Sequence, residues 1–400
     1  MTALADHHRS YRICRFCVMD SSNPAIEFDS SGQCNCCRDA VARQQHEWWP
    51  GAEGETRMRR MVAELKAHGH SKSYDVLIGL SGGIDSAYLA HVAVRKLGLR
   101  VLAVHVDGGW NSEPAVRNIE SIVRALDIDL HTYVVEWQEM RELQVAFLRS
   151  SVLNQDIPQD HAFFSTLYRT AAKFGLRHFL SGVNFASENI VPPLWGYPYT
   201  DAKHLRAVHA MHASTPLRSY PCMGLPEYLW ITRVRKQLTV HRPLNYLCYN
   251  KDAAAEELKH EYRWRDYGGK HCESRFTKFY QEVYLPKKIA FDKRRLHLSS
   301  LIVSGQLTRT QALAQLQEPI GSPEQLRRDT RFVAKKLGLP ASELEVFLER
   351  PLVSHLAYPN QNALHTRLTA LRRLMRRLSP RRDNLGESVQ RNPLTEEDAA

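Results

Sequence analysis

Long apolar runs are absent from this sequence. None of its 400 residues lies in an apolar run of about 18 residues, the length that a transmembrane helix needs. Residues 1–9 also lack the apolar core of a signal peptide. We therefore expect no membrane span and a cytoplasmic protein.

Cysteines beyond residue 37 are few and isolated. Five of the eight cysteines come earlier, and the later ones are Cys222, Cys248 and Cys272. The early cluster follows the pattern C-x2-C-x16-C-x2-C, formed by Cys14, Cys17, Cys34 and Cys37. In a cytoplasmic chain this spacing predicts a structural Zn²⁺ held by four thiolates rather than disulfides. Cys36 could replace Cys37 as the fourth ligand, and cysteines alone also permit an iron–sulfur cluster.

Acidic residues are too few to balance the basic ones, and the formal net charge is +11. Much of the excess is local, because seven arginines lie between residues 367 and 382. The same stretch carries an apolar stripe made of Leu364, Leu368, Leu371, Met375 and Leu378. We expect residues 361–400 to form a basic helix followed by a disordered tail, and we expect no nucleic-acid partner.

A glycine-rich turn joins a predicted strand to a predicted helix, and it lacks the lysine of a Walker motif. Ser81-Gly-Gly-Ile-Asp-Ser86 follows the apolar run at 75–80 and precedes a helical pattern at 86–97. Its glycines let backbone N–H groups approach an anion, and a helix N-terminus favours negative charge. The simpler alternative is a turn in which Asp85 only serves the first helical turn.

Strands and helices alternate through the first half of the chain. Strand-like runs lie at 75–80, 101–106, 131–135 and 177–181, and helical patterns lie at 58–67, 86–97, 114–126 and 161–174. The alternation predicts an α/β fold, with a parallel sheet and helices on both faces. Residues 81–86, 107–112 and 182–188 leave strand ends, so we expect them to converge at the carboxyl edge of the sheet.

Composition divides the chain into five regions. We expect a zinc-ribbon-like unit at 1–45, a helical connector at 46–72 and a nucleotide-binding α/β domain at 73–190. A mostly helical region for substrate or partner binding follows at 191–360, and the basic helix and tail occupy 361–400.

The turn at Ser81–Ser86 resembles the PP-loop of the ATP pyrophosphatase superfamily, which has the pattern SGGxDS. This resemblance implies an adenine nucleotide alpha-hydrolase-like fold and cleavage of ATP to AMP and pyrophosphate. Further blocks resemble the N-acetyl sugar amidotransferases of bacterial surface-polysaccharide synthesis: 18–20, 26–29, 109–113, 268–277 and 291–300. The likeness covers residues 12–355, and Cys36 and Cys272 stand where that family usually has other residues.

The resemblance implies an amide-to-amidine conversion in lipopolysaccharide O-antigen synthesis. The acetamido oxygen of a nucleotide-linked sugar, most simply a UDP-linked diacetamido sugar, attacks the α-phosphorus of ATP. Pyrophosphate leaves, and ammonia then displaces AMP from the O-adenylyl imidate. The ammonia is expected from a separate glutaminase subunit that works with a cyclase-like, ammonia-channelling subunit. ATP, Mg²⁺ and a structural Zn²⁺ are the expected cofactors.

Site residues follow from the PP-loop, the strand ends and the downstream blocks. For the nucleotide we expect Ser81, Gly82, Gly83, Asp85, Ser86, Asp107 and Gly182. The candidate catalytic residues are Asp85, Ser86, Lys270 and Lys278, with Asp85 helping to hold Mg²⁺. The candidate substrate residues are Asn184, Glu188, His271, Glu273, Arg294 and Arg295. Asp107 could instead cap its turn, and Asp160 with His161 could simply cap a helix.

Two other functional classes fit parts of the sequence. A PP-loop tRNA sulfurtransferase would also adenylate a carbonyl oxygen and would suit the positive charge, but the later cysteines form no C-x-x-C pair. A zinc-ribbon adaptor that docks a partner through its basic helix is the non-enzymatic alternative. Amidating PP-loop enzymes with their own glutaminase domain are a poorer fit, because the N-terminal region is a cysteine unit.

Overall fold

A computed structural model describes residues 10–23, 25–192, 197–234 and 238–363. The predicted basic helix with its apolar stripe and the predicted disordered tail lie outside the described residues. Within the described part of the chain, no helix is long and apolar enough to cross a membrane.

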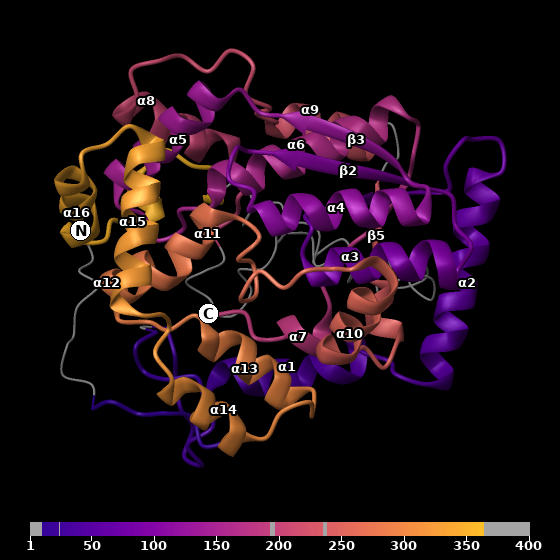
Figure 1. The fold of residues 1–400 in the computed structure, drawn as a ribbon, viewed down its shortest axis with the longest axis horizontal. Helices are drawn as coiled ribbons and strands as arrows, with labels where there is room; N and C mark the ends of the chain where they lie inside the picture. The colour runs from indigo at the N-terminus through magenta and orange to yellow at the C-terminus, as the bar shows by residue number, and fades with distance from the viewer. Residues whose placement is uncertain (1–9, 24, 193–196, 235–237, 364–400) are drawn as a thin grey trace.

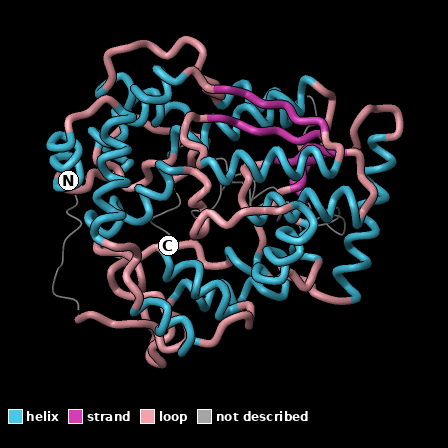
Figure 2. The backbone as a smooth tube through the Cα atoms, in the orientation of Figure 1, coloured by secondary structure: helices cyan, strands magenta, loops and turns pink. Residues whose placement is uncertain are grey.

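The core of the fold is a five-stranded parallel sheet with the order β3-β2-β1-β4-β5 (Figure 2). Its strands are β1 (Val76–Gly79), β2 (Val101–Asp107), β3 (Asp129–Val134), β4 (His178–Leu180) and β5 (Thr239–His241). The four predicted strands are confirmed. The region after residue 191 is helical for the most part, but it also supplies β5, which pairs with β4 from His178↔Thr239 to Leu180↔His241. This edge strand was not predicted from the sequence, and it lies in a region with no clear alternation of strands and helices.

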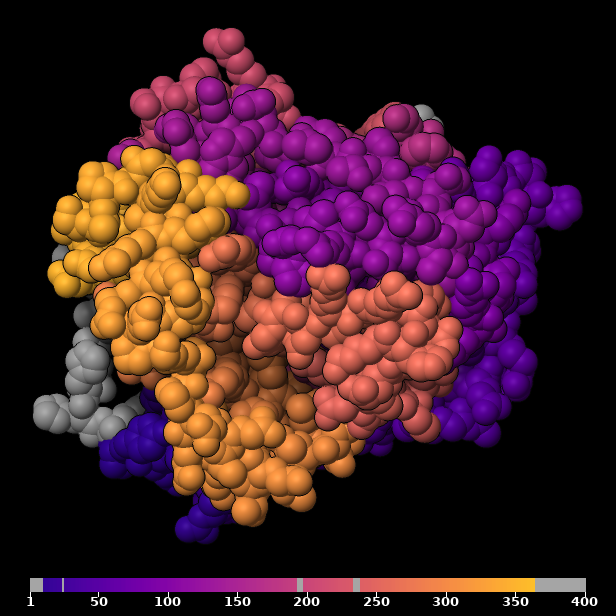
Figure 3. All heavy atoms as spheres, in the orientation of Figure 1, coloured from indigo at the N-terminus to yellow at the C-terminus, as the bar shows by residue number. Residues whose placement is uncertain are grey.

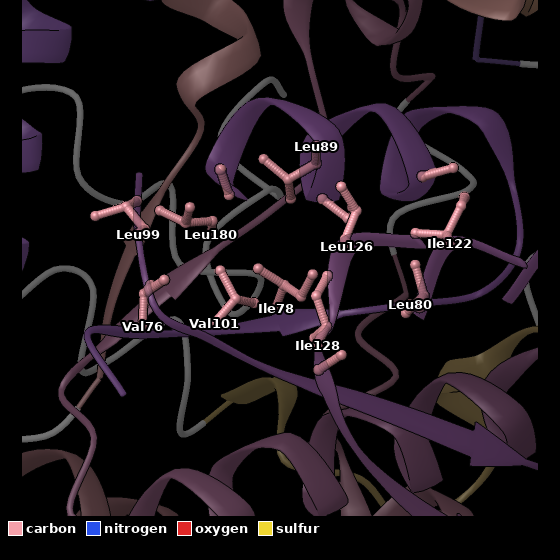
Figure 4. Packing of buried hydrophobic residues seen from close by; sticks show 14 of the residues in the cluster. Val76, Ile78, Leu80, Leu89, Leu99, Val101, Ile122, Leu126, Ile128 and Leu180 are labelled. Atoms are coloured by element: carbon pink, nitrogen blue, oxygen red, sulfur yellow. The ribbon is translucent and has the colours of Figure 1, made fainter. Parts of the chain in front are cut away.

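Helices lie on both faces of the sheet (Figure 1). Alternate residues of the central strands pack against the helices on one face or the other. Val76, Ile78 and Val101 join one cluster with α3 (Ile84–His91) and α4 (Glu113–Leu126). Leu77 and Leu102 join another with α6 (Ile157–Lys173). Both faces are therefore buried, as the continuous apolar strands predict. Figure 4 shows the first cluster, where Leu89, Ile122 and Leu126 point toward the strand residues.

Helices outside the sheet complete the molecule. The N-terminal ones are α1 (Asn35–Glu47) and α2 (Ala52–Gly69). Between the sheet strands, and after them, lie α5 (Trp137–Ser150), α7 (Phe185–Glu188), α8 (Ala202–His212), α9 (Leu225–Leu229) and α10 (Lys251–Tyr262). The C-terminal ones are α11 (Arg275–Phe279), α12 (Leu285–Ile289), α13 (Arg294–Val303), α14 (Arg309–Gln317), α15 (Pro323–Leu337) and α16 (Ala341–Glu349).

The C-terminal helices join the N-terminal cysteine unit to the sheet domain. In the space-filling view they cover the left and lower parts of one face, beside the purple sheet domain (Figure 3). The Arg309 guanidinium donates to the carbonyl oxygens of Cys14 and Cys17 at 2.9–3.2 Å. Arg295 Nη1 donates to the Val18 carbonyl oxygen at 2.8 Å, and Val18 N donates to Ser299 Oγ at 3.2 Å. The cysteine unit is thus fastened to α13 and α14.

Candidate active site

The PP-loop-like turn lies where β1 ends and α3 begins. Gly82 has φ +81°, and a Cβ atom there would come within 2.4 Å of the Ala115 carbonyl oxygen, so only glycine fits this position. Ser81 Oγ lies 3.1 Å from Ser86 Oγ and accepts a hydrogen bond from Gly83 N at 3.2 Å. The hydroxyl groups and backbone N–H groups gather at a helix N-terminus, an arrangement that suits a phosphate group.

A cavity of about 590 Å³ opens beside this turn. Its wall includes Ser81, Gly83, Asp85 and Ser86 from the turn, Gly108 and Asn111 from the segment after β2, and Gly182 and Glu188 from the segment after β4. The three strand ends that we expected to converge therefore do so. The segment 267–274 and Lys293 supply the opposite wall.

Lys270 forms the centre of a buried ion-pair network in this cavity. Its Nζ lies 3.2 Å from Asp85 Oδ2 and 3.0 Å from Glu188 Oε1, and it donates to Ser187 Oγ at 2.8 Å. The Lys270 side chain is only 5% exposed. Burial alone would lower its pKa, but the carboxylates of Asp85 and Glu188 outweigh that effect and raise the pKa. The network brings together three predicted site residues from three separate chain segments.

The two carboxylates have further partners. Asp85 Oδ1 accepts from Asn184 Nδ2 at 3.1 Å and from the Tyr249 hydroxyl at 2.6 Å. Glu188 Oε1 also lies 3.5 Å from His271 Nε2. Burial would raise the pKa of Glu188, but Lys270 and His271 outweigh that effect and lower it. Both carboxylates are therefore held in fixed positions, which suits the binding of a cation.

Tyr267 and Glu273 reach across the PP-loop-like turn. Ile84 N donates to the Tyr267 hydroxyl at 3.1 Å, and Ser81 Oγ donates to Glu273 Oε1 at 3.4 Å. Glu273 Oε2 is buried without a hydrogen-bond partner among the described residues. Sequence reasoning singled out Glu273 as a substrate residue but overlooked Tyr267, which immediately precedes the Gly268–Thr277 block.

A second group of titratable side chains lines the same cavity. Burial raises the pKa of Asp156 to about 6 and that of Asp160 to about 7, where the charge of Asp156 adds to the effect. Burial also lowers the pKa of Lys293 to about 8. Asp156 is tied to Thr277 Oγ1 and Gln159 Nε2, whereas the Asp160 side chain faces the open space of the cavity. Lys293 lies in the block at 291–300 that carries part of the family resemblance, but sequence reasoning chose its neighbours Arg294 and Arg295 as substrate residues instead.

Several predicted site residues do not reach the cavity. Lys278 lies between Glu282 at 2.5 Å and Asp329 at 2.7 Å. Arg294 pairs with Asp292 at 2.7 Å, and Arg295 pairs with Asp20 at 2.9 Å. These three cations hold helices and the cysteine unit together. The sequence made Lys278 a candidate catalytic residue and made Arg294 and Arg295 candidate substrate residues. In the structure these three side chains form ion pairs outside the cavity instead.

Two more predicted residues have structural partners. Asp107 Oδ1 accepts from Gly109 N at 2.7 Å and from Asn111 Nδ2 at 3.1 Å, so Asp107 caps its turn, as the simpler alternative held. His161 Nδ1 lies 2.7 Å from the Tyr199 carbonyl oxygen, and its Nε2 accepts from Met223 N at 3.0 Å. The helix cap is Asp156 rather than Asp160.

The four-cysteine cluster lies apart from the cavity. The Sγ atoms of Cys14, Cys17, Cys34 and Cys37 all lie within 4.8 Å of one another, and the Cys14–Cys37, Cys17–Cys34 and Cys34–Cys37 pairs lie 3.5–3.7 Å apart. Four thiolates about 2.3 Å from one Zn²⁺ in a tetrahedron would lie about 3.8 Å apart, so the cluster has the right size. Backbone N–H groups of Phe16, Cys17 and Cys34 point at Cys14 Sγ. Cys36 Sγ instead faces Asn35 Oδ1, so Cys37 completes the cluster.

Two protein families match parts of this chain, and each match includes residues that line the cavity. Residues 57–177 match the NAD synthase family, and residues 273–374 match the family "LPS biosynthesis protein WbpG-like, C-terminal domain". The chain is therefore similar to NAD synthase over its sheet domain and to the WbpG-like C-terminal domain over its C-terminal helices. The second match begins at Glu273, which contacts the PP-loop-like turn, so residues of both matched regions line the cavity.

Individual relatives match this chain over short stretches. A GMP synthase of Pyrobaculum aerophilum is 32% identical over 90 residues, which is 22% of this chain and 17% of the relative. A probable GMP synthase of Caenorhabditis elegans is 41% identical over 59 residues, or 14% of this chain and 8% of the relative. The matches therefore span less than a fifth of the length of either relative.

Solved structures add weak likenesses. The NH3-dependent NAD synthetase of Campylobacter jejuni is 19% identical, with 34% of this chain and 58% of that chain covered and a TM-score of 0.27. The NMN synthetase of Francisella tularensis is 17% identical, with 52% and 93% covered and the same TM-score. TM-scores this low add nothing to the family matches.

Proposed function

We propose that this protein is an ATP-dependent sugar amidotransferase of surface-polysaccharide synthesis. It would convert the acetamido group of a nucleotide-linked sugar, such as a UDP-linked diacetamido sugar, to an acetamidino group, with AMP and pyrophosphate as products. The observation that carries the proposal is the single cavity shared by the PP-loop and the WbpG-like domain, with Lys270 bridging Asp85 and Glu188.

The nucleotide end of the cavity suits ATP bound with Mg²⁺. Carboxylate oxygens are the ligands that Mg²⁺ takes in phosphate-transfer sites, so Asp85 and Glu188 are the residues that would hold it. Bound there, the ion would offset charge on the phosphates as pyrophosphate leaves. Ser81, Ser86 and the Gly83 N–H group would position the phosphate oxygens. Lys270 adds a cation within reach of the same groups.

The other end of the cavity suits the sugar and the incoming nitrogen. His271 and Lys293 face it and would bind the diphosphate of a nucleotide sugar. At neutral pH ammonia arrives as ammonium and must lose a proton before it can attack the imidate carbon. Asp160, whose pKa is raised to about 7, is our candidate for the group that takes this proton. Ammonia from a glutaminase partner with a cyclase-like subunit remains part of the proposal.

The four-cysteine unit would hold a structural Zn²⁺. All four thiols are fully buried, so no position remains open for a substrate, as in closed structural zinc sites. Through Arg309, Arg295 and Ser299 the unit would hold α13, which begins directly after Lys293.

A tRNA sulfurtransferase is the less favoured function. Sulfur transfer by cysteine needs a thiol that can reach the activated base, and no cysteine lines the cavity within the described part of the chain. Cys272 comes closest in sequence, but it is 6% exposed and burial raises its pKa to about 12. Its Sγ contacts Glu282 and the Lys270 carbonyl oxygen instead.

Product analysis tests the proposal directly. The protein is incubated with Mg-ATP, ammonium and a UDP-linked diacetamido sugar, and the nucleotide and sugar products are weighed by mass spectrometry. We expect AMP, pyrophosphate and a sugar lighter by the difference between O and NH. ADP in place of AMP would contradict the PP-loop chemistry. Formation of AMP without a change in the mass of the UDP-linked diacetamido sugar would contradict the proposed acceptor.

A further inference from the structure

The segment Tyr267–Glu273 fills the positions that Mg²⁺ and pyrophosphate need. The Lys270 ammonium group lies between the Asp85 and Glu188 carboxylates, where a divalent cation would bind. The Glu273 carboxylate accepts from Ser81 Oγ, and the Tyr267 hydroxyl accepts from Ile84 N. Both acceptors therefore use donors of the turn that would otherwise serve phosphate oxygens.

The charge pattern supports this interpretation. A cation faces the two carboxylates, and an anion faces the phosphate-binding turn, so the segment reproduces the charge distribution of a metal–pyrophosphate pair. A Cβ atom on Gly83 would come within 2.9 Å of Glu273 Oε1, which shows how closely the carboxylate approaches the turn. ATP phosphates placed beside an unmoved Glu273 would meet a like charge at this short range.

The two ends of the segment are anchored to neighbouring segments. Asn118 accepts from Arg265 N at 2.7 Å and donates to the Gly82 carbonyl oxygen at 3.2 Å, and this fixes the first end. Ser112 N donates to the Glu273 carbonyl oxygen at 2.8 Å, and this fixes the second end. Between them Gly268 has φ +90° with no atom near its Cβ position, and His271 has φ +61°, a conformation that non-glycine residues rarely adopt. A displacement of the segment would therefore change the backbone between these two anchors and leave the anchors in place.

We propose that Tyr267–Glu273 is an internal substitute for magnesium pyrophosphate, which ATP and Mg²⁺ displace when they bind. The proposal rests on the proposed ATP and Mg²⁺ chemistry, but not on the sugar or the ammonia. Displacement releases Lys270 and Glu273 from the turn and separates His271 from Glu188, so nucleotide binding reshapes the end of the cavity that takes the second substrate. Empty enzyme would keep its phosphate-binding turn satisfied and closed to other anions.

Two single substitutions test the two halves of the substitute. In the absence of ATP, the Lys270→Met variant should bind Mn²⁺ at least about tenfold more tightly than the wild type. The reason is that the Lys270 ammonium group no longer competes with Mn²⁺ for the two carboxylates. Electron paramagnetic resonance of free Mn²⁺ measures this. Lys278→Met is the matched control, because Lys278 also bridges two carboxylates but lies outside the cavity. Glu273→Gln should bind metal-free pyrophosphate more tightly by calorimetry. Unchanged or weaker binding by both variants would overturn the proposal.

Hydrogen exchange of the unmodified full chain provides a test that does not depend on how the variants fold. Amides of residues 266–272 should exchange faster when Mg²⁺ and α,β-methylene-ATP are added, and trypsin should cleave after Lys270 more readily. Slower exchange there would mean that the segment stays on the turn and binds the nucleotide in place, which also overturns the proposal. Neither readout involves sugar or ammonia, so failure here leaves the amidotransferase proposal standing. In the product assay an unchanged sugar leaves the present proposal standing, whereas ADP in place of AMP would remove the pyrophosphate chemistry on which it rests.

Discussion

Two neighbouring regions of the C-terminal half place a lysine between two carboxylates, with opposite consequences. In the first, Lys270 bridges Asp85 and Glu188 inside the cavity. In the second, Lys278 bridges Glu282 and Asp329 outside it. The pKa of each lysine is lowered by burial and raised more strongly by its carboxylates. The local chemistry is the same, so only the surroundings of the carboxylates separate a functional network from a structural one.

The carboxylates differ in where they come from. Asp85 and Glu188 follow the ends of two adjacent parallel strands, beside a turn that can bind phosphate. Glu282 lies one helical turn after Lys278, and Asp329 lies on α15, which packs on the same C-terminal cluster. A network at the carboxyl edge of a parallel sheet faces a ligand, whereas a network between packed helices fixes those helices.

Substitution of two neighbouring cysteines, one inside and one outside the four-cysteine cluster, extends this comparison to the N-terminal unit. The substitution inside the cluster should have the largest effect of all. Cys37→Ala removes a predicted zinc ligand, so the protein should lose its zinc and about 4 kcal/mol or more of unfolding free energy. Cys36→Ala should keep about one zinc per chain. Metal analysis and denaturant unfolding measure both. Retention of zinc by the Cys37 variant, with loss in the Cys36 variant, would reverse the assignment.

Removal of the lysines should separate activity from stability. Lys270→Met should lower the rate of AMP formation by about 10²–10³-fold, the cost of losing one charge that stabilises a transition state. Lys278→Met should leave that rate within a few-fold of the wild type and lower the melting temperature instead. The assay follows pyrophosphate release with Mg-ATP, sugar and ammonium. Equal losses of rate in both variants would remove the distinction between the two networks.

Substitution of one carboxylate in each network should have the same kind of effect as substitution of its lysine, but a smaller one. Mg²⁺ should raise the ATP affinity of the Glu188→Gln variant about tenfold less than it raises that of the wild type, because one carboxylate ligand loses its charge. Glu282→Gln should leave that dependence unchanged. Calorimetric titration of ATP at several Mg²⁺ concentrations gives both values. An unchanged Mg²⁺ dependence in the Glu188 variant would place the metal elsewhere in the cavity.

The dependence of stability on pH should come from Asp160 in the cavity rather than from the ion pairs of Lys278. The pKa of Asp160 is about 7 in the folded protein and about 3.9 in an unfolded chain. The folded state therefore holds a proton that the unfolded state releases, and this makes stability fall as pH rises from about 4 to 7 and stay level above that. The melting temperature of Asp160→Asn relative to the wild type should therefore rise across this range. The exposed Asp266→Asn controls for loss of charge, and a constant difference for Asp160→Asn would contradict the shift.

Truncation should have the smallest effect. Gln361 N donates to Asp201 Oδ2 at 2.6 Å, so the cut belongs after residue 363. Removal of residues 364–400, with their cluster of arginines, should change ATP turnover by no more than about twofold, since the residues that line the cavity in the described part of the chain, from Gly79 to Lys293, all remain. A large loss of turnover with the fold retained would show that the arginines contribute to the site.

Sequence reasoning was most successful where a motif and its secondary structure lay in one short segment. The PP-loop at Ser81–Ser86, the four cysteines and four of the five strands are each specified by adjacent residues, and all of them stand in the structure as expected. It was least successful for isolated cations. Lys270, Lys278, Arg294 and Arg295 were equal candidates, and Lys293 was passed over, because a long flexible side chain carries no local sign of the carboxylate that it will meet.

The sequence by itself determined the chemistry that is available: an anion-binding turn before a helix, a thiolate cluster of the spacing that zinc requires, and a sheet of alternating βαβ units. Those properties depend on backbone conformation and on neighbours a few residues away. The tertiary structure alone decided which charges meet. It brought Lys270 onto two carboxylates, 185 and 82 residues earlier in the chain, and placed Lys278 in a different network eight residues on. Ion pairs between distant segments exist only once the sheet and the C-terminal helices have packed together, because packing brings their charges into contact and removes the water that would screen them.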